Sequence, residues 1–279
     1  MESFRAGRSL SAAALLALAG AVLGGCEPAQ PYVTSARLER GLVIVLPGVE
    51  GCSPFNAAIC EGLDAGGVKY AIELCDWTAP WGPLANLRAE GRNRRQAKDL
   101  AARVTAYALR YPENPVVLVG QSGGGAIAVW AAEALPPGGR IDGAILLAPS
   151  LSPGYRLDGA LENCGRGIVN FRSPRDVVFL GLGTMIAGTM DGEHASSAGR
   201  VGFDLPPVGG PRDDAYAKFH QVVWHERMGD SANPGMHVTS GAKQFVSDYV
   251  VPLVLARQWD KRLIDTVVRD LPTTAPAAD

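Results

Sequence analysis

The sequence has little net charge and no long run of residues of one sign. Its 26 basic and 28 acidic residues give a formal net charge of −2 at pH 7 over 279 residues. Proteins that bind nucleic acids or acidic membrane surfaces concentrate Lys and Arg along one segment or face. The sequence therefore gives no sign of a nucleic-acid partner or of electrostatic binding to a membrane.

The apolar run at the N-terminus is too short for a membrane-spanning helix. It extends from Leu10 to Leu23, whereas a spanning helix needs about 20 apolar residues. Arg5 and Arg8 precede it, and the small residues Gly24 and Gly25 follow it. This order is typical of a secretory signal peptide, so we expect residues 1–25 to be removed on export.

The end of this segment, Leu23-Gly24-Gly25-Cys26, resembles the lipobox of bacterial lipoproteins. The resemblance implies that Cys26 is acylated and becomes the N-terminus of the mature protein. Each buried CH₂ contributes roughly 0.8 kcal/mol, so two or more acyl chains anchor a protein stably. The implied location is the bacterial cell envelope, with residues 26–40 as a tether to the membrane. Ordinary cleavage followed by free secretion is the alternative.

Cysteine is scarce, with four residues left after Cys26. They lack the paired CxxC spacing of a structural zinc site, so we expect no metal. An even number of cysteines in an exported chain suggests two disulfides, for which three pairings exist. We expect Cys52 and Cys60 to form one of them, which leaves Cys75 and Cys164.

The sequence is rich in short apolar runs that alternate with segments of helical periodicity. With 47% apolar residues, a chain of 279 residues can bury the core of one domain. Leu42 to Leu46 is a continuous apolar run ended by Pro47-Gly48, which is typical of a strand buried on both faces of a parallel sheet.

Similar patterns predict the remaining elements. Strands are expected at 68–74, 115–120, 141–148, 167–171 and 221–224, and helices at 92–111, 126–135 and 239–255. The alternation predicts an α/β fold with a mostly parallel central sheet flanked by helices. One domain is expected over residues 41–270, followed by a disordered tail at 271–279 that is rich in Pro, Thr and Ala.

One predicted strand leads into a glycine-rich turn that holds a serine. Residues 116–119 are followed by Gly120-Gln121-Ser122-Gly123-Gly124 and then by a helix. This is the G-x-S-x-G pattern that presents a nucleophile on a tight strand-to-helix turn. Side chains at positions 120 and 124 are expected to collide with neighbouring backbone. A nucleotide-binding turn is the alternative, but neither of its glycine motifs is present.

These residues, in this context, resemble the α/β-hydrolase superfamily over nearly all of residues 41–258. The resemblance implies a serine hydrolase that cleaves an ester or related acyl bond in a small-molecule or lipid substrate. Ser122 would be the nucleophile, and neither a metal nor an organic cofactor is implied. The Gly123 N–H would be one oxyanion donor, and Val49 is the candidate for the second. Many family members have His-Gly where this chain has Pro47-Gly48.

The family order of catalytic groups is serine, acid and histidine. The chain has four histidines, at positions 194, 220, 225 and 237. His237 lies just before the last predicted helix, where the family carries its general base. Asp176 follows the strand after residues 141–148 and matches the acid, while Asp191 and Asp204 are weaker candidates. Asp176 could instead merely cap the turn or pair with Arg175.

Two further interpretations stay open at this point. A catalytically silent, lipid-anchored binding protein on the same fold is one, because fold does not imply function. Retention of Ser122, Asp176 and His237 argues against it. An acyltransferase or a peptidase with the same triad is the other, because nucleophiles other than water can resolve an acyl-enzyme.

Overall fold

The computed structural model describes residues 30–176, 179–180, 184–185, 188–194, 196–207, 210 and 213–269. The predicted signal peptide, Cys26 and the predicted tail at 271–279 lie outside the described residues. Among the described helices, none combines the length and the apolar composition needed to cross a membrane.

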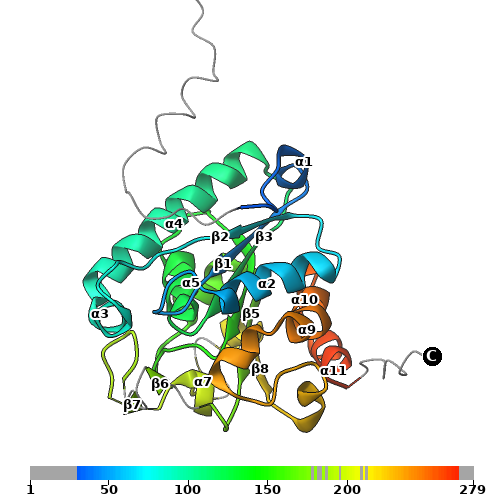
Figure 1. The fold of residues 1–279 in the computed structure, drawn as a ribbon. Coiled ribbons are helices and arrows are strands. Elements are labelled where there is room, and N and C mark those ends of the chain that lie inside the picture. Colours follow the sequence, from blue (N-terminus) through cyan, green and yellow to red (C-terminus); the bar gives the residue numbers. More distant parts are fainter. Residues whose placement is uncertain are drawn as a thin grey trace, which may run out of the picture.

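A parallel sheet forms the centre of the fold (Figure 1). In the described residues it has six strands in the order β2-β1-β3-β4-β5-β8, and all neighbouring pairs are parallel. The strands are β1 Leu42–Leu46, β2 Ala71–Leu74, β3 Val116–Gln121, β4 Ile141–Leu147, β5 Cys164–Arg172 and β8 Phe219–Val223. A short antiparallel pair, β6 Phe179–Leu180 and β7 Thr184–Met185, stands apart. The predicted parallel α/β architecture is confirmed.

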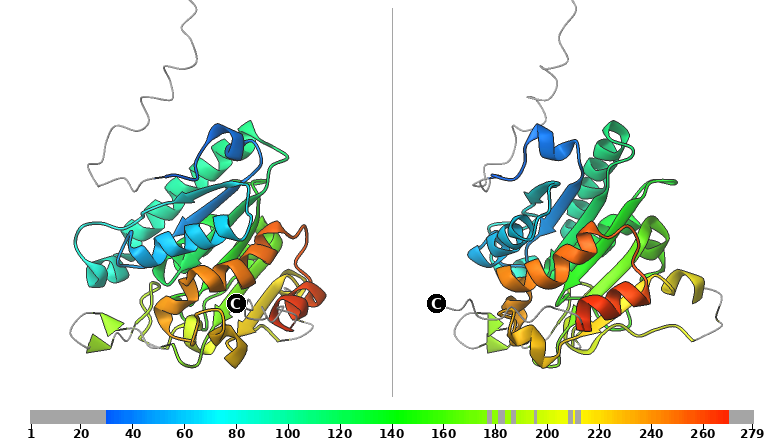
Figure 2. Two further views of the ribbon diagram at one scale, coloured as in Figure 1. Left: turned by 45° about the vertical axis from the view of Figure 1, so that its right-hand side comes forward. Right: turned by 90° about the vertical axis from the view of Figure 1, so that its right-hand side faces the viewer.

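Helices cover both faces of this sheet (Figure 2). One face packs against α4 Glu90–Arg110, α5 Gly123–Glu133 and α6 Asp158–Asn163. The other packs against α2 Pro54–Ala65, α9 Lys243–Phe245, η4 Val246–Val250, α10 Val251–Leu255 and α11 Lys261–Arg269. Successive residues of a strand point to opposite faces, so Ile44 and Val45 of β1 belong to different cores. Both faces of β1 are buried, as its apolar run predicts.

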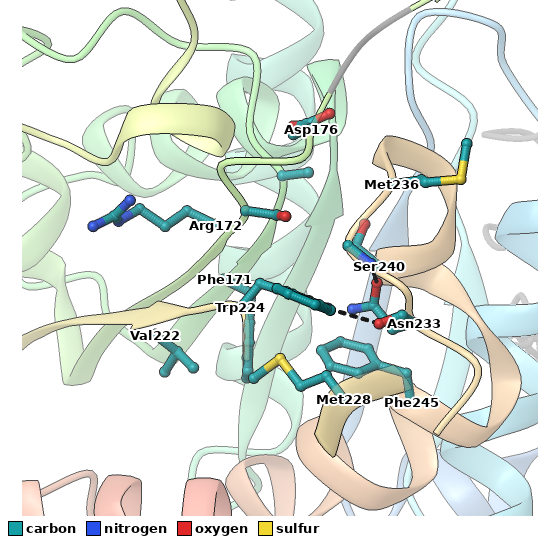
Figure 3. Close-up of a pocket in the computed structure, with 13 residues that line it drawn as sticks. Phe171, Arg172, Asp176, Val222, Trp224, Met228, Asn233, Met236, Ser240 and Phe245 are labelled. Atoms are coloured by element: carbon teal, nitrogen blue, oxygen red, sulfur yellow. Dashed lines mark hydrogen bonds between the residues drawn. The ribbon is translucent and has the colours of Figure 1, made fainter. Parts of the chain in front are cut away.

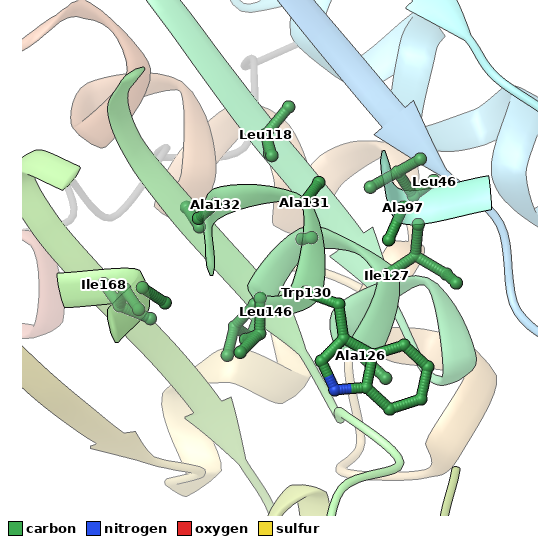
Figure 4. Close-up of a cluster of buried hydrophobic side chains, with 14 of the residues drawn as sticks. Leu46, Ala97, Leu118, Ala126, Ile127, Trp130, Ala131, Ala132, Leu146 and Ile168 are labelled. Carbon is green, nitrogen blue, oxygen red and sulfur yellow. The ribbon is translucent and has the colours of Figure 1, made fainter. Parts of the chain in front are cut away.

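Helix α5 is buried along nearly its whole length, from Gly123 to Ala132. Its glycines and alanines let it lie close to the sheet, with Ile127 on the side of Leu46 and Ala97 (Figure 4). A helix packed on all sides has little freedom to move. Its first turn, which directly follows Ser122, is therefore held firmly at the edge of the sheet.

Shorter helices lie in the connections. They are α1 Ser35–Leu38, α3 Pro83–Arg88, α7 Ala198–Val201, α8 Asp213–Tyr216, η2 Glu226–Gly229 and η3 His237–Gly241. Because parallel strands end at the same edge of a sheet, the loops after β1, β3, β4, β5 and β8 gather at one edge.

The C-terminal region differs from its prediction as one helix over 239–255. The structure divides it into η3, α9, the wide turn η4 and α10, and adds α11. Pro252 has no backbone N–H to donate back along the helix, and a wide helical turn directly precedes α10. Residues 243–255 nevertheless stay helical across this wide turn, so the predicted helix is confirmed there. It is wrong at 239–242, where η3 ends and Ala242 is extended.

The segment before β1 contacts the domain from Gln30 onward. The Gln30 side chain donates to Leu74 O at 2.8 Å and accepts from Leu74 N at 3.1 Å, along the edge of β2. Arg37 donates to Tyr70 O at 2.9 Å and pairs with Asp64 at 2.8 Å. Part of the stretch expected as a tether therefore covers the outer edge of the sheet, where unpaired backbone groups would otherwise be exposed.

The expected disulfides are not formed, which corrects the prediction that Cys52 pairs with Cys60. Cys52, Cys60, Cys75 and Cys164 are all free. Cys60 lies in the core on one face of the sheet and Cys164 in the core on the other, so the sheet separates them. Burial raises the pKa of both thiols to about 12, which fits apolar packing rather than reactivity.

Candidate active site

Ser122 lies between the end of β3 and the start of α5 in a backbone conformation that few residues adopt. Its φ is 54° and its ψ is −120°, and this positive φ is costly for a residue with a Cβ. Two bonds to β4 and to the loop after it hold the turn: Ser122 N donates to Leu147 O at 2.9 Å, and Ser150 N donates to Ser122 O at 3.0 Å. The strain is thus fixed by the sheet itself.

The flanking glycines are required by close backbone contacts. A Cβ on Gly120 would collide with Gly124 O, and a Cβ on Gly124 would collide with Leu46 O. The predicted collisions at both positions are confirmed. The glycines allow β3, β1 and the first turn of α5 to approach closely enough to form the sharp turn that carries Ser122.

The loop after β1 packs directly against the first turn of α5. Val49 is buried, and its Cγ1 lies 2.8 Å from where a Cβ on Gly123 would be. Trp77 Nε1 donates to Pro47 O at 2.7 Å, and Asn86 Nδ2 donates to Val49 O at 3.0 Å. Among the described residues, Val49 N–H has no acceptor. In the first turn of α5, Gly125 N donates to Ser122 O at 3.0 Å, whereas Gly123 N likewise has no acceptor among the described residues. The N–H groups of Val49 and Gly123 are therefore both available to a ligand.

His237 and Asp176 form a buried pair. His237 begins η3, Asp176 follows β5, and their atoms Nδ1 and Oδ1 lie 2.8 Å apart. The side chains are 11% and 1% exposed, so water competes little with this bond. Arg175 instead lies over the ring of Trp224, so the alternative in which Asp176 pairs with Arg175 is not observed.

The other candidates for acid and base have different partners. Asp191 accepts from Ser152 N at 3.0 Å and from Ser152 Oγ, and Asp204 is exposed. His220 Nε2 lies 3.1 Å from Trp259 O. His194 is exposed, and His225 packs against Tyr249. Of the three candidate acids and four histidines, the structure joins only Asp176 and His237 within the described part of the chain.

Ser122 and His237 are brought to the same edge of the sheet but are not bonded. In the described part of the structure, no hydrogen bond joins the Ser122 hydroxyl to the His237 ring. Hydrogen bonds between catalytic groups are often long in ligand-free proteins and tighten with substrate. Their neighbours indicate that Ser122 and His237 lie near each other. Gly123, next to Ser122, packs against Val49, and Glu50, next to Val49, is close enough to His237 for their charges to interact.

Glu50 adds a carboxyl group that sequence reasoning did not assign. The Glu50 carboxylate folds back over Gly48. A Cβ added to Gly48 would collide with this carboxylate and would lie 2.8 Å from Gln121 Oε1. Burial raises the pKa of Glu50, although its own backbone N–H, Asn56 and the charge of His237 oppose the shift.

A pocket in the structure is lined by the turn that carries Asp176 (Figure 3). Its walls come from the ends of β5 and β8, the turn of Asp176, the loop before His237 and the end of α9. Neither Ser122 nor His237 lines it. This pocket therefore borders the Asp176 turn and not the Ser122 hydroxyl.

Sequence reasoning missed two residues next to the pair, Trp224 and Asn233. Both line this pocket, and Trp224 Nε1 donates to Asn233 O at 2.7 Å (Figure 3). Asn233-Pro234-Gly235 is a turn signal that could have pointed to a fixed loop before His237. No sequence pattern around Trp224 points to it, because its contacts are with Asn233 and Arg175, which are separated from it along the chain.

One family model matches part of the chain. Its description is serine aminopeptidase, S33, and it matches residues 88–173, which is less than a third of the chain. The match includes the turn of Ser122 but ends before Asp176 and His237. No curated protein is detectably similar in sequence.

Solved structures with similar folds are distant in sequence. Lipase B from Aspergillus fumigatus has a TM-score of 0.50 at 14% identity over 83% of this chain and 57% of its own. The chain thus spans little more than half of that protein. Est1E from Butyrivibrio proteoclasticus has a TM-score of 0.48 at 14% identity, over 77% of this chain and 87% of its own.

TT1662 from Thermus thermophilus has a TM-score of 0.45 at 18% identity, over 78% of this chain and 90% of its own. At these identities a similarity concerns the fold alone. The parallel sheet, the strained serine turn and the partial family match together show that this chain has the α/β-hydrolase fold.

Proposed function

We propose that this protein is a serine hydrolase that cleaves an ester or a related acyl bond through an acyl-enzyme on Ser122. The observation that carries the proposal is the combination of a strained serine at the end of β3 with a buried His237–Asp176 pair at the same edge. Strain at a non-glycine residue persists only where the surroundings enforce it. Such strain clusters at active sites, where it holds a reactive side chain in a fixed position.

The first step transfers the acyl group to the protein. His237 Nε2 takes the proton of the Ser122 hydroxyl while the oxygen attacks the acyl carbon. The carbonyl π electrons move to its oxygen, which the N–H groups of Gly123 and Val49 stabilise. When the tetrahedral intermediate collapses, the bond to the leaving oxygen breaks, and His237 returns the proton to that oxygen.

The second step regenerates the serine. Water attacks the acyl carbon, His237 takes its proton, and the bond to Ser122 breaks as the same proton returns to the serine oxygen. Asp176 accepts the Nδ1–H bond throughout and stabilises the imidazolium. Protein groups and water supply every proton and electron pair in this sequence.

Burst kinetics tests the proposal on the full chain with short-chain 4-nitrophenyl esters. We expect a rapid release of about one nitrophenol per chain, followed by slower steady turnover, because an acyl-enzyme accumulates when its hydrolysis is slower than its formation. Inactivation by a fluorophosphonate should remove both phases.

The same assay separates the competing functions. Faster turnover with an added alcohol, together with formation of a new ester, would indicate an acyltransferase. Cleavage of matched 4-nitroanilides at comparable rates would indicate a peptidase. A folded protein with neither burst nor turnover on esters and anilides would favour a silent binding protein and contradict the proposal.

We further propose that the protein is exported and anchored to a membrane of the bacterial cell envelope by lipid on Cys26. This rests on the sequence of residues 1–26 alone. Incorporation of labelled palmitate into the parent but not into Cys26→Ser would support it. Equal incorporation into both would contradict it.

A further inference from the structure

Trp224 lies where the turn that carries Asp176 meets the loop that carries His237. It directly follows β8, and its backbone N–H donates to Arg172 O at 2.8 Å, which continues the pairing between β8 and β5. The sheet therefore fixes the position of its backbone. Its half-buried indole lines the same pocket as Asp176 (Figure 3).

One edge of the indole holds the loop before His237. Nε1 donates to Asn233 O at 2.7 Å. Gly235 has a φ of +93°, and a Cβ there would lie 3.1 Å from Cδ2 and Cε2 of the indole. The ring therefore contacts this loop both through a hydrogen bond and through close packing against the Gly235 backbone.

The face of the indole contacts the turn before Asp176. The guanidinium carbon of Arg175 lies 4.1 Å from the ring centroid, within the range of a cation–π interaction. The same turn is closed by a bond from Asp176 N to Ser173 O at 2.9 Å. Ser173 Oγ also lies 2.8 Å from where a Cβ on Gly235 would be, so turn and loop touch each other directly.

Asn233 extends this support to the far side of His237. Its Oδ1 accepts from Gly235 N at 3.1 Å and from Thr239 Oγ1 at 2.8 Å. Asn233 is 4% exposed, so these bonds are shielded from water. Gly235, before His237, and Thr239, after it, are thus both bonded to Asn233. The backbone carbonyl of Asn233 is also the acceptor of the Trp224 indole N–H.

From these contacts we propose that Trp224 is a positioning residue that holds His237 Nδ1 against Asp176 Oδ1. The inference rests on the proposed function, because it assigns Trp224 a part in acyl transfer. The indole N–H of Trp224 bonds to neither the His237 nor the Asp176 side chain. Trp224 acts on them through Asn233, Gly235 and Arg175. A displacement of about 1 Å in a catalytic group can cost about 10²-fold in rate, so such a support affects turnover.

The test compares Trp224→Phe with Trp259→Phe. Phenylalanine retains an aromatic ring but loses the N–H donor. Trp259 is a matched control, because its Nε1 also donates to a backbone carbonyl, Leu253 O, at 2.8 Å and it is buried in the core on the face of the sheet that α10 and α11 cover. We expect Trp224→Phe to lower kcat about 10- to 100-fold with KM unchanged, and Trp259→Phe to leave kcat unchanged.

Proton NMR gives a readout that a loss of stability alone would not move. The Nδ1–H proton shared with Asp176 should resonate far downfield in the parent and in Trp259→Phe. It should broaden or move in Trp224→Phe. Arg175→Gln removes a cation from the exposed side of the ring and serves as a second variant if Trp224→Phe does not fold; it should change the same resonance.

The outcomes separate the inference from the proposed function. If the parent turns over esters while Trp224→Phe matches Trp259→Phe in kcat and in the downfield resonance, the positioning role is wrong and the function stands. If the parent shows no turnover, the function is wrong, and the NMR comparison still decides whether Trp224 orients the pair.

Discussion

Replacing Ser122 with alanine should lower kcat for ester hydrolysis about 10⁶-fold while leaving the fold intact. Alanine has no nucleophile, so only binding and the oxyanion donors can still act. It also keeps the Cβ that the backbone at φ 54° already accommodates. Initial rates with 4-nitrophenyl esters measure the loss, and circular dichroism checks the fold.

Serine and histidine should act as a unit in this experiment. His237→Ala is expected to cost nearly as much as Ser122→Ala, and the double variant no more than either. Ser247→Ala is the control, because Ser247 lies in η4, away from the sheet edge that carries Ser122. Independent losses that multiply in the double variant would show that His237 does not act through Ser122.

Asp176→Asn should lower kcat about 10⁴-fold near neutral pH with little change in KM. An asparagine amide in place of Oδ1 can donate to His237 Nδ1, which moves the ring proton to Nε2. Nε2 then cannot accept the serine proton. Because the 2.8 Å contact is buried, water cannot readily restore the correct tautomer. Steady-state kinetics with the same esters measure the change.

Asp191→Asn discriminates between Asp176 and Asp191 as the catalytic acid. The Asp191 carboxylate accepts from Ser152 N and Ser152 Oγ and does not contact His237. Its loss should change kcat far less than Asp176→Asn. The reverse ranking would contradict the assignment of Asp176.

Features that depend on short stretches of chain could be predicted from the sequence. The strands Leu42–Leu46 and Val116–Gln121 are buried at every residue, and their runs of consecutive apolar residues predict this. The glycines at 120 and 124 are required by backbone contacts in and next to the turn of Ser122. His237 and Asp176 were found because chain order restricts the choice, and the structure places their side chains in contact. Their catalytic roles remain predictions.

Features that depend on distant neighbours could not be predicted. Cys60 and Cys164 lie on opposite faces of the sheet, which no spacing reveals. Trp224 and Asn233 gain their importance from lying beside residues far along the chain. The carboxyl of Glu50 follows from the way its loop folds back over Gly48. The helix predicted over 239–255 was drawn too long because its apolar pattern continues across the extended backbone at Ala242, after which the helix begins.

The central claim is that Ser122 is a nucleophile, and mass spectrometry of a fluorophosphonate adduct tests it most directly. The full chain is incubated with the probe, its intact mass is measured, and the labelled peptide is sequenced. The account predicts one adduct per chain, located on Ser122, and no adduct on Ser122→Ala. A folded parent that stays unlabelled, or an adduct on a different residue, would contradict it.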